Sequence, residues 1–330
     1  MPIKKTPKQV VVLGSTGSLG SQTLEVLEKY PEEFRVVGLS ANVSAAELNM
    51  QAKKYKVKNI MLAAGDGKKA LEKLAGLPEA DIVVNVLSGI AGLKPAIAAL
   101  NSKKILLLGN KESLVAEGKK MMSLAKNRLI PIDSEHNAIF EILKKYPHGK
   151  IKKIIIPCSG GPFWGKRGKE LESITAKEAL RHPKWHMGAK ISLESAIYIN
   201  KGMEIIEAHH LFNIPFEKIE IKIHPECFIH GMVEFEKEII GYISRPDMKE
   251  HIENALLRAA NLPLPPRKIE PIKLENFTFL DPNALVIEGI NTVLNAGNYR
   301  QFLKREEKIL RQFLDGEIKF TEILENLRKF

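Results

Sequence analysis

Cysteine is scarce in this sequence and long apolar runs are absent, and both facts restrict what the protein can be. Its 330 residues include only Cys158 and Cys227, neither in a CxxC pair. This excludes a disulfide framework and predicts buried thiols in a reducing compartment. No apolar stretch reaches the ~20 residues that cross a bilayer, and residues 1–9 lack the apolar core of a signal peptide. We therefore expect a cytoplasmic protein without membrane partners.

Charge and complexity narrow the choice further. The sequence has no low-complexity tract and no repeat of solenoid length, and its length indicates two or three domains. The formal net charge of +11 raises the question of nucleic acid. However, the lysines are spread along the chain beside glutamates, as in Glu306-Glu307-Lys308, and no nucleic-acid motif accompanies them. A salt-bridged surface, or a field that attracts small phosphorylated ligands, fits this pattern better.

The pattern of apolar residues predicts an α/β fold in three parts. In residues 1–150, apolar runs alternate with helical patterns, which indicates a Rossmann-like parallel sheet covered on both faces. Residues 151–275 form a central α+β part, and residues 276–330 a short helical C-terminal region. The runs that we interpret as strands are 9–13, 34–39, 81–87, 104–108, 128–133, 152–158, 217–224 and 232–244. Residues 190–212 are expected to form one long helix, and Glu236-Lys237 a hairpin turn.

A glycine-rich loop, Gly14-Ser15-Thr16-Gly17-Ser18-Leu19-Gly20, follows the first strand and opens a helix. Gly14 permits a tight turn, Gly17 lets backbone amides approach a pyrophosphate, and Gly20 allows close packing. This context favours dinucleotide binding over an ordinary turn. The second strand ends in Ser40-Ala41-Asn42, where no carboxylate would repel a 2′-phosphate, so NADP is favoured although no basic residue stands there.

Two acids, Asp133 and Glu135, stand two residues apart at the end of a predicted strand, which would place them on one face. Such a pair is unfavourable unless it is protonated, paired or metal-bound, and hard oxygen ligands suit Mg²⁺ or Mn²⁺. From position alone, a helix cap by Asp133 or Ser134 explains the run equally well.

Other polar residues could complete such a site. Glu204 shares a helix face with Asn200 and Lys201, so it is either a third acid or part of a surface Lys–Glu pair. On a continuous helix, Ser195 would lie near the helix start, where exposed amides help to hold phosphate. Ser159 precedes a glycine turn that offers a similar anion nest. The loop His182-Pro183-Lys184-Trp185-His186-Met187-Gly188 suits a lid that excludes water, although a lone histidine is usually structural.

Together these segments resemble the 1-deoxy-D-xylulose 5-phosphate reductoisomerase family. The matching blocks occur in family order, which is far more specific than a glycine loop alone. They are GSTGSLGSQTLEV from Gly14, GNKESLV from Gly109, PIDSEHNAIF from Pro131, SGGPF from Ser159, HPKWHMGAKIS from His182, SAIYINKGMEIIEAHHLF from Ser195, IHPECFIHGMVEF from Ile223 and PDM at Pro246.

The resemblance implies a role for each matching residue. NADPH would be bound by Thr16, Gly17, Ser18, Leu19, Ala41, Asn42, Asn110, Glu112, Met187 and Gly188. A divalent ion, Mg²⁺ or Mn²⁺ with Co²⁺ as a further candidate, would be held by Asp133, Glu135 and Glu204. The substrate would contact Lys111, Ser134, Glu135, Ser159, His182, Ser195, Asn200, Lys201 and Glu204. Lys111, Glu135 and Lys201 would be catalytic, and Trp185 would lie in the lid.

The implied reaction rearranges 1-deoxy-D-xylulose 5-phosphate by retro-aldol cleavage and re-addition, with the metal stabilising the enolate charge. Hydride from NADPH then reduces the aldehyde to 2-C-methyl-D-erythritol 4-phosphate, an isoprenoid precursor. Residues 1–150 would bind NADPH, and 151–275 would carry catalysis and the contacts of a homodimer. The chain departs from the family pattern in three places: the basic residue near Asn42 is missing, His186 replaces a small polar residue, and the C-terminal helical domain is shortened after NAGNYRQFLKREEKIL.

Three alternatives stand beside this hypothesis. Another Rossmann-type enzyme, such as a homoserine or semialdehyde dehydrogenase, would not need the three acids. An NADP-sensing binding protein would have no use for those acids and Lys201. A nucleic-acid binder would be retained on DNA in a salt-sensitive manner.

Overall fold

The computed structural model describes residues 6–181 and 188–329, which divide into two compact units. Unit 1 comprises Met1–Asn137 and Asp247–Pro266, and unit 2 comprises Ala138–Pro246 and Arg267–Phe330. Within the described ranges, no helix combines the length and the apolar character that a membrane crossing requires. Cys158 and Cys227 are both buried and form no disulfide, as their isolation in the sequence predicted.

Unit 1 is built on a six-stranded parallel sheet in the order β3-β2-β1-β4-β5-β6. This confirms the predicted Rossmann-like sheet. The strands are β1 (Lys8–Leu13), β2 (Phe34–Ala41), β3 (Asn59–Leu62), β4 (Ile82–Asn85), β5 (Ile105–Leu108) and β6 (Leu129–Pro131). The helices are α1 (Ser18–Leu27), α2 (Ala45–Tyr55), α3 (Ala63–Asp66), α4 (Lys68–Ala75), the 3₁₀ turn η1 (Gly89–Gly92), α5 (Leu93–Asn101), α6 (Lys111–Ala125), the start of α7 (Ser134–Lys145), and α12 (Met248–Ala259).

The order of the strands determines where this unit can bind a ligand. The central strand β1 is buried throughout Val10–Leu13 because β2 and β4 flank it and helices cover both faces. The strand order reverses between β1 and β4. In open α/β sheets, a crevice forms at such a reversal, outside the carboxyl ends of the strands.

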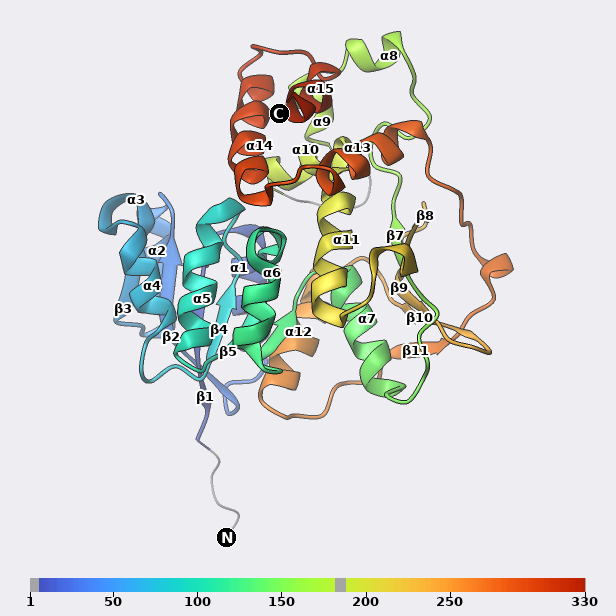
Figure 1. Ribbon diagram of the computed structural model, residues 1–330. Helices are drawn as coiled ribbons and strands as arrows, with labels where there is room; N and C mark the ends of the chain where they lie inside the picture. The colour runs from blue at the N-terminus through green and yellow to red at the C-terminus, as the bar shows by residue number, and fades with distance from the viewer. Residues whose placement is uncertain (1–5, 182–187, 330) are drawn as a thin grey trace. The chain divides into compact units, whose positions relative to one another are not determined.

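Helix α12 joins unit 1 from much later in the sequence. It packs against α1, and the Lys249 ammonium lies 2.5 Å from a Glu25 carboxylate oxygen. The Tyr30 hydroxyl donates a hydrogen bond of 2.9 Å to Glu253. Figure 1 shows this orange helix among the blue and green elements of the N-terminal half.

Unit 2 contains a mixed five-stranded sheet in the order β11-β10-β9-β7-β8. Only β7 and β8 pair in parallel, and Phe235 N–H bonds to the Glu238 carbonyl across the predicted hairpin turn. The strands are β7 (Lys153–Cys158), β8 (Ile219–Ile223), β9 (Ile229–Glu234), β10 (Ile239–Ile243) and β11 (Lys268–Pro271). The remaining elements are α8 (Lys169–Glu172), α9 (Ala176–Ala179), α10 (Ala189–Ala196), α11 (Ile199–Phe212), η2 (Phe216–Lys218), η3 (Leu274–Asn276), α13 (Ala284–Leu294), α14 (Tyr299–Leu314) and α15 (Glu322–Arg328).

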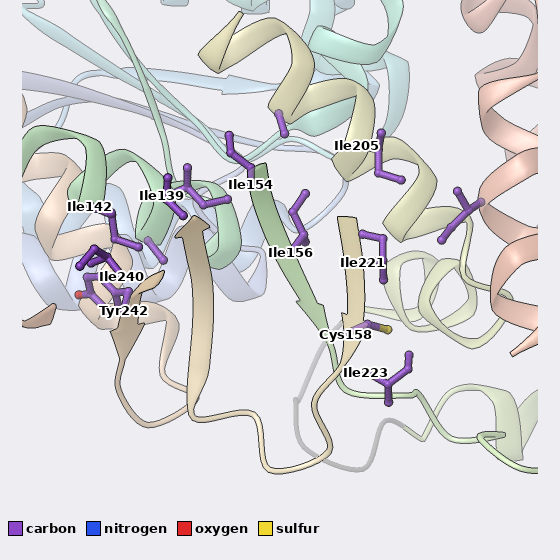
Figure 2. Packing of buried hydrophobic residues seen from close by; sticks show 14 of the residues in the cluster. Ile139, Ile142, Ile154, Ile156, Cys158, Ile205, Ile221, Ile223, Ile240 and Tyr242 are labelled. Carbon is purple, nitrogen blue, oxygen red and sulfur yellow. The ribbon is translucent and has the colours of Figure 1, made fainter. Parts of the chain in front are cut away.

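The core of unit 2 lies between one face of this sheet and helices α7 and α11. Ile154 and Ile156 of β7 point to the same side because side chains alternate along a strand. There they pack with Ile139 of α7 and Ile205 of α11 in one buried cluster, which Figure 2 shows from close by. Ile155 packs in a second cluster, on the opposite face. The α+β character predicted for the centre of the chain is therefore confirmed.

The prediction of one continuous helix over residues 190–212 is wrong. Helix α10 ends at Ala196, and Tyr198 adopts left-handed backbone angles (φ 61°, ψ 8°) before α11 begins. Such a conformation is unfavourable for an aromatic residue unless the surroundings fix it. Here the buried Tyr198 ring packs in the core, and its hydroxyl donates a 2.6 Å hydrogen bond to the Gly160 carbonyl.

The C-terminal helices confirm the predicted helical region, and one of them carries a buried acid. Glu306 of α14 is fully buried, and its carboxylate lies 3.1 Å from the Lys190 ammonium of α10. Lys190 also pairs with Glu194 on its own helix. Burial raises the pKa of Glu306 well above its ordinary value, and the nearby Glu194 carboxylate raises it further, while Lys190 acts in the opposite direction.

We expect the E306Q variant to become more stable relative to the wild type as pH rises. A carboxyl group with a raised folded pKa contributes fully to stability below its ordinary pKa of 4.5, and that contribution is lost at higher pH. Glutamine cannot ionise, so the difference in unfolding free energy should move in favour of E306Q by about 1 kcal/mol or more between about pH 5 and about pH 8. Urea denaturation at each pH measures this difference. The exposed neighbour variant E307Q should show no trend, and a flat profile for E306Q would refute the assignment.

Candidate functional site

Several predicted site residues of unit 1 lie at one edge of its sheet. The loops that follow β1, β2, β4, β5 and β6 all leave from the carboxyl ends of parallel strands. The glycine loop, Asn42, the residues from Asn110 and the residues from Asp133 therefore share this edge. Their gathering follows from the topology alone, since parallel strands all end on the same side.

The glycine loop has the geometry that a dinucleotide site requires. A Cβ atom on Gly20 would lie 2.1 Å from the Gly14 carbonyl oxygen, so only glycine allows α1 to approach the loop this closely. Gly14 has φ +85°, which other residues rarely adopt. Gly17 caps α1 and is exposed, and the nearest atom to a Cβ there would be 3.4 Å away. This space beside a helix N-terminus fits a pyrophosphate.

Residues outside the glycine motif brace this loop. The Gly14 amide donates to the Ser40 hydroxyl at 3.1 Å, and the Ser15 hydroxyl donates to Gln51 Oε1 at 2.7 Å. Gln51 Nε2 returns a bond to the Ser15 carbonyl. The sequence reading missed Gln51 because no motif marks a side chain that reaches the loop from α2. At the end of β2, Ala41 is buried and Asn42 is exposed.

Asn110 and Glu112, predicted to contact the cofactor, form a buried network around the loop after β4. Asn110 Nδ2 donates to the carbonyls of Leu87 and Gly89 and to Glu112 Oε2, at 2.8–2.9 Å. The Gly89 amide donates to Glu112 Oε1 at 2.7 Å. These two side chains therefore fix the shape of the loop beside the crevice, and a direct cofactor contact stays a prediction.

Asp133 forms an ion pair with the buried Lys111 and is itself only 12% exposed. The Lys111 ammonium lies 2.6 Å from Asp133 Oδ2, and the His136 ring nitrogen Nδ1 lies 3.1 Å from Oδ1. Burial by itself would raise the pKa of Asp133. The Lys111 charge and the hydrogen bond with His136 outweigh it and hold that pKa well below its ordinary value. The carboxylate is therefore ionised, as a cation ligand must be.

Of the two alternatives for the Asp133 run, the helix cap is confirmed for Asp133, and the metal site stays a prediction. The Glu135 amide donates to Asp133 Oδ1 at 3.3 Å, so Asp133 does cap the start of α7. Its other oxygen faces Lys111, which a cap does not explain. The strand argument for a shared face is wrong, because β6 ends at Pro131 and α7 begins at Ser134. Ser134 donates to Glu135 Oε2 at 2.6 Å and does not act as the cap.

A second buried cluster lies on α11 in unit 2. Asn200 Nδ2 donates to Glu204 Oε1 at 2.5 Å, and the Lys201 ammonium bonds to Oε2 at 2.6 Å. All three residues are less than one-tenth exposed, which rules out a surface Lys–Glu pair. A buried carboxylate with hydrogen bonds on both oxygens is held in a fixed orientation. Carboxylate oxygens of this kind are the ligands that Mg²⁺ prefers.

The Ser159 turn of unit 2 lies beside Ser195. Gly160 and Gly161 both have positive φ, and the Ser159 hydroxyl accepts the Gly161 amide at 3.1 Å. A Cβ on Gly161 would lie 3.4 Å from the Ser195 carbonyl, so the turn and the end of α10 are neighbours. Ser195 therefore stands in the last turn of α10, and its predicted place near a helix start is wrong. Tyr198, which sequence reasoning missed, ties this turn to α11.

His182, Trp185, His186 and Met187 lie outside the described residues. Gly188 caps α10 and is exposed.

Comparisons with known proteins agree with this geometry. The profile of 1-deoxy-D-xylulose 5-phosphate reductoisomerase matches residues 10–66 and 59–118, and that of the 1-deoxy-D-xylulose 5-phosphate reductoisomerase C-terminal domain matches residues 129–212. A relative of that name from Thermodesulfovibrio yellowstonii is 39% identical over 98% of this chain and 91% of its own. This chain belongs to the 1-deoxy-D-xylulose 5-phosphate reductoisomerase family. The Aquifex aeolicus member is 37% identical over 95% and 88% of the two chains.

Solved structures of the reductoisomerase family share the fold. A DOX-P reductoisomerase in complex with NADPH, fosmidomycin and magnesium has a TM-score of 0.84 and 29% identity, covering 98% of this chain and 89% of that one. The Zymomonas mobilis enzyme in complex with NADPH has a TM-score of 0.82 and 32% identity, covering 98% and 91%. The family resemblance predicted from the ordered sequence blocks is confirmed.

Two glycine variants should separate packing from cofactor binding. G20A places a Cβ against backbone atoms, so we expect the unfolding free energy to fall by about 1–3 kcal/mol. G17A has room for its methyl group and should fold normally, but the methyl occupies the approach to the pyrophosphate. We expect its NADPH affinity to fall about tenfold. Urea denaturation and titration of NADPH fluorescence measure the two effects. Equal stability of the two variants would contradict the packing argument.

Proposed function

We propose that this protein catalyses the NADPH- and divalent-metal-dependent conversion of 1-deoxy-D-xylulose 5-phosphate to 2-C-methyl-D-erythritol 4-phosphate. One observation carries the proposal beyond family membership. Two acids predicted to bind the metal, Asp133 with 12% and Glu204 with 2% of the side chain exposed, are each paired with a lysine at 2.6 Å. Both lysines, Lys111 and Lys201, stand at positions that the family resemblance assigns to substrate contact.

We propose Asp133, Glu135 and Glu204 as the ligands of one divalent ion, Mg²⁺ or Mn²⁺, with Co²⁺ as a further candidate. Their donor atoms are carboxylate oxygens, which fit hard cations. When bound, such an ion stabilises negative charge on adjacent substrate oxygens. NADPH supplies the hydride when it occupies the crevice beside the glycine loop.

The residues of the chain bind and orient the substrate. The Ser159 turn, Ser195 and Asn200 offer hydroxyl, amide and backbone donors for the phosphate and hydroxyl groups. Lys111 and Lys201 hold their ammonium groups 2.6 Å from the carboxyl oxygens of Asp133 and Glu204, where each can also contact an anionic oxygen of the substrate. Binding of the phosphate far from the reacting carbons would hold the two fragments in place during cleavage and re-addition.

Metal removal tests this function directly. We expect turnover of 1-deoxy-D-xylulose 5-phosphate with NADPH to disappear with a chelator and to return with Mg²⁺ or Mn²⁺. E204Q should lower kcat/KM by more than the about 10–100-fold typical of a lost outer-shell partner. The exposed control E238Q should retain wild-type activity.

The rival enzymes give different results in the same assay. Turnover that resists the chelator would favour a dehydrogenase that needs no ion. NADPH binding without turnover of this substrate would favour a binding protein. Normal activity of E204Q would overturn the assignment of Glu204.

We further propose a cytoplasmic homodimer formed through the sheet of unit 2. Two buried free thiols suit a reducing compartment. Helices α7 and α11 cover one face of the sheet, and two large apolar residues near it are exposed, Phe228 by 47% and Leu280 by 42%. Contiguous exposed apolar patches commonly mark contacts between proteins, and we propose that Phe228 and Leu280 contribute to such a patch.

Sedimentation equilibrium checks the dimer. The wild-type protein should have twice the mass of one chain. The F228S dimer should already dissociate at higher protein concentrations than the wild-type dimer, because it loses apolar contact area. V43S, which alters a residue of unit 1 that is 70% exposed, is the control and should leave the mass unchanged. A wild-type protein with the mass of one chain at all concentrations would refute the dimer.

A further inference from the structure

Asn137 holds the segment that carries Asp133 and Glu135. Its side chain is fully buried in unit 1. The backbone N–H of Asn137 donates to the Asp133 carbonyl at 2.8 Å, and the side-chain Nδ2 of Asn137 donates to the Pro131 carbonyl at 3.0 Å. One residue thus binds two carbonyls on either side of Ile132, at the junction between β6 and α7. These two bonds enclose the turn from Pro131 to Asn137, which contains both acids.

Helix α12 fixes the orientation of the Asn137 side chain. Asn137 Oδ1 accepts a 3.0 Å hydrogen bond from Asn254 Nδ2, and it lies 3.2 Å from His251 Nδ1. The Pro131 carbonyl can only accept, so the amide group must present its nitrogen to Pro131 and its oxygen to α12. The oxygen in turn accepts, so His251 carries a proton on Nδ1. The hydrogen bonds among His251, Asn254, Asn137 and Pro131 are therefore satisfied by a single assignment of donors and acceptors.

The pair on α12 stands one helical turn apart. His251 and Asn254 are spaced i and i+3, which places both side chains on the same face of the helix. Both are fully buried. Apolar side chains would pack an interior face without any need for matched partners, whereas these two polar groups specify one position of Asn137. Their burial therefore points to a positional requirement at the β6–α7 junction.

We propose that Asn137, His251 and Asn254 are positioning residues that set the affinity of the Asp133 and Glu135 carboxylates for a divalent cation. The inference rests on the proposed metal-dependent function and deepens it. Asn137 acts on the backbone that carries the acids, and α12 acts on Asn137. Outer partners of this type orient metal ligands, and their loss typically weakens metal binding by about 10–100-fold.

Direct measurement of Mn²⁺ binding to the full-length protein tests the network. Titration followed by electron paramagnetic resonance reports free Mn²⁺ without any need for turnover. We expect N254L, which removes one donor to Asn137 while keeping a similar volume, to weaken Mn²⁺ binding by about 10–100-fold. H251Q keeps an N–H donor and should retain wild-type affinity, whereas H251L should resemble N254L. E253Q lies between these positions, keeps an acceptor for Tyr30, and is the matched control.

Two further measurements separate the possible outcomes. D133N should abolish binding, and if it binds Mn²⁺ normally then the proposed metal site itself is wrong. Circular dichroism and urea denaturation establish that each variant is folded. If D133N loses binding while folded N254L and H251L keep wild-type affinity, the network is only structural and the inference is overturned. Should N254L not fold, N254S gives the same comparison, because its shorter side chain loses the reach to Asn137.

Discussion

The pairing of buried carboxylates with lysines is the constraint on which the candidate site depends. An isolated ionised carboxylate in a protein interior is strongly unfavourable, and a group in that position would normally take up a proton. Lys111 offsets this penalty for Asp133 and, together with His136, holds the pKa of that carboxyl well below its ordinary value. Asp133 therefore stays charged although little of it reaches solvent, and Glu204 has a lysine partner of its own in Lys201. The two lysines also bring positive charge to the places where an anionic substrate is expected.

The surrounding structure serves to hold these pairs in place. Lys111 begins α6 directly after β5, and Asp133 follows β6, so the parallel pairing of β5 with β6 brings them together. In unit 2 the pair lies within one turn of α11, whose start is fixed by the strained Tyr198 and its bond to Gly160. Strain of this kind persists only where neighbouring contacts determine the conformation, and it is common near functional sites. Each ion pair is thus fixed by secondary structure together with one contact between separate segments of the chain.

Much of this arrangement could be predicted from the sequence, because the relevant signals are local. Continuous apolar runs gave five of the six strands of unit 1, and the glycine spacing located the loop after β1. The missed strand, β3, is an edge strand with half-buried residues, so it lacks a continuous apolar pattern. The break at Tyr198 was missed for a related reason: no glycine or proline marks it, and the helical periodicity continues on both sides.

Contacts between distant segments could not be predicted in this way. Gln51 beside the glycine loop and Asn254 beside Asn137 are ordinary polar residues on helices, and their partners depend on the tertiary structure. The discontinuity of unit 1 was equally hidden, because α12 has the composition of any amphipathic helix. A sequence motif identifies residues that match it, whereas residues such as Gln51 and Asn254, which hold the motif residues in place, are identified only in the folded structure.

That discontinuity has a consequence for synthesis on the ribosome. Unit 1 needs Asp247–Pro266, so its N-terminal sheet leaves the exit tunnel long before its last helix. At about 5–20 residues per second, the stretch from Asn137 to Pro266 takes on the order of ten seconds to emerge. During this interval α1 lacks its partner helix α12, and Asn137 at the β6–α7 junction lacks its hydrogen bonds with His251 and Asn254. The nascent chain therefore carries an unfinished β6–α7 junction until most of the polypeptide has been translated.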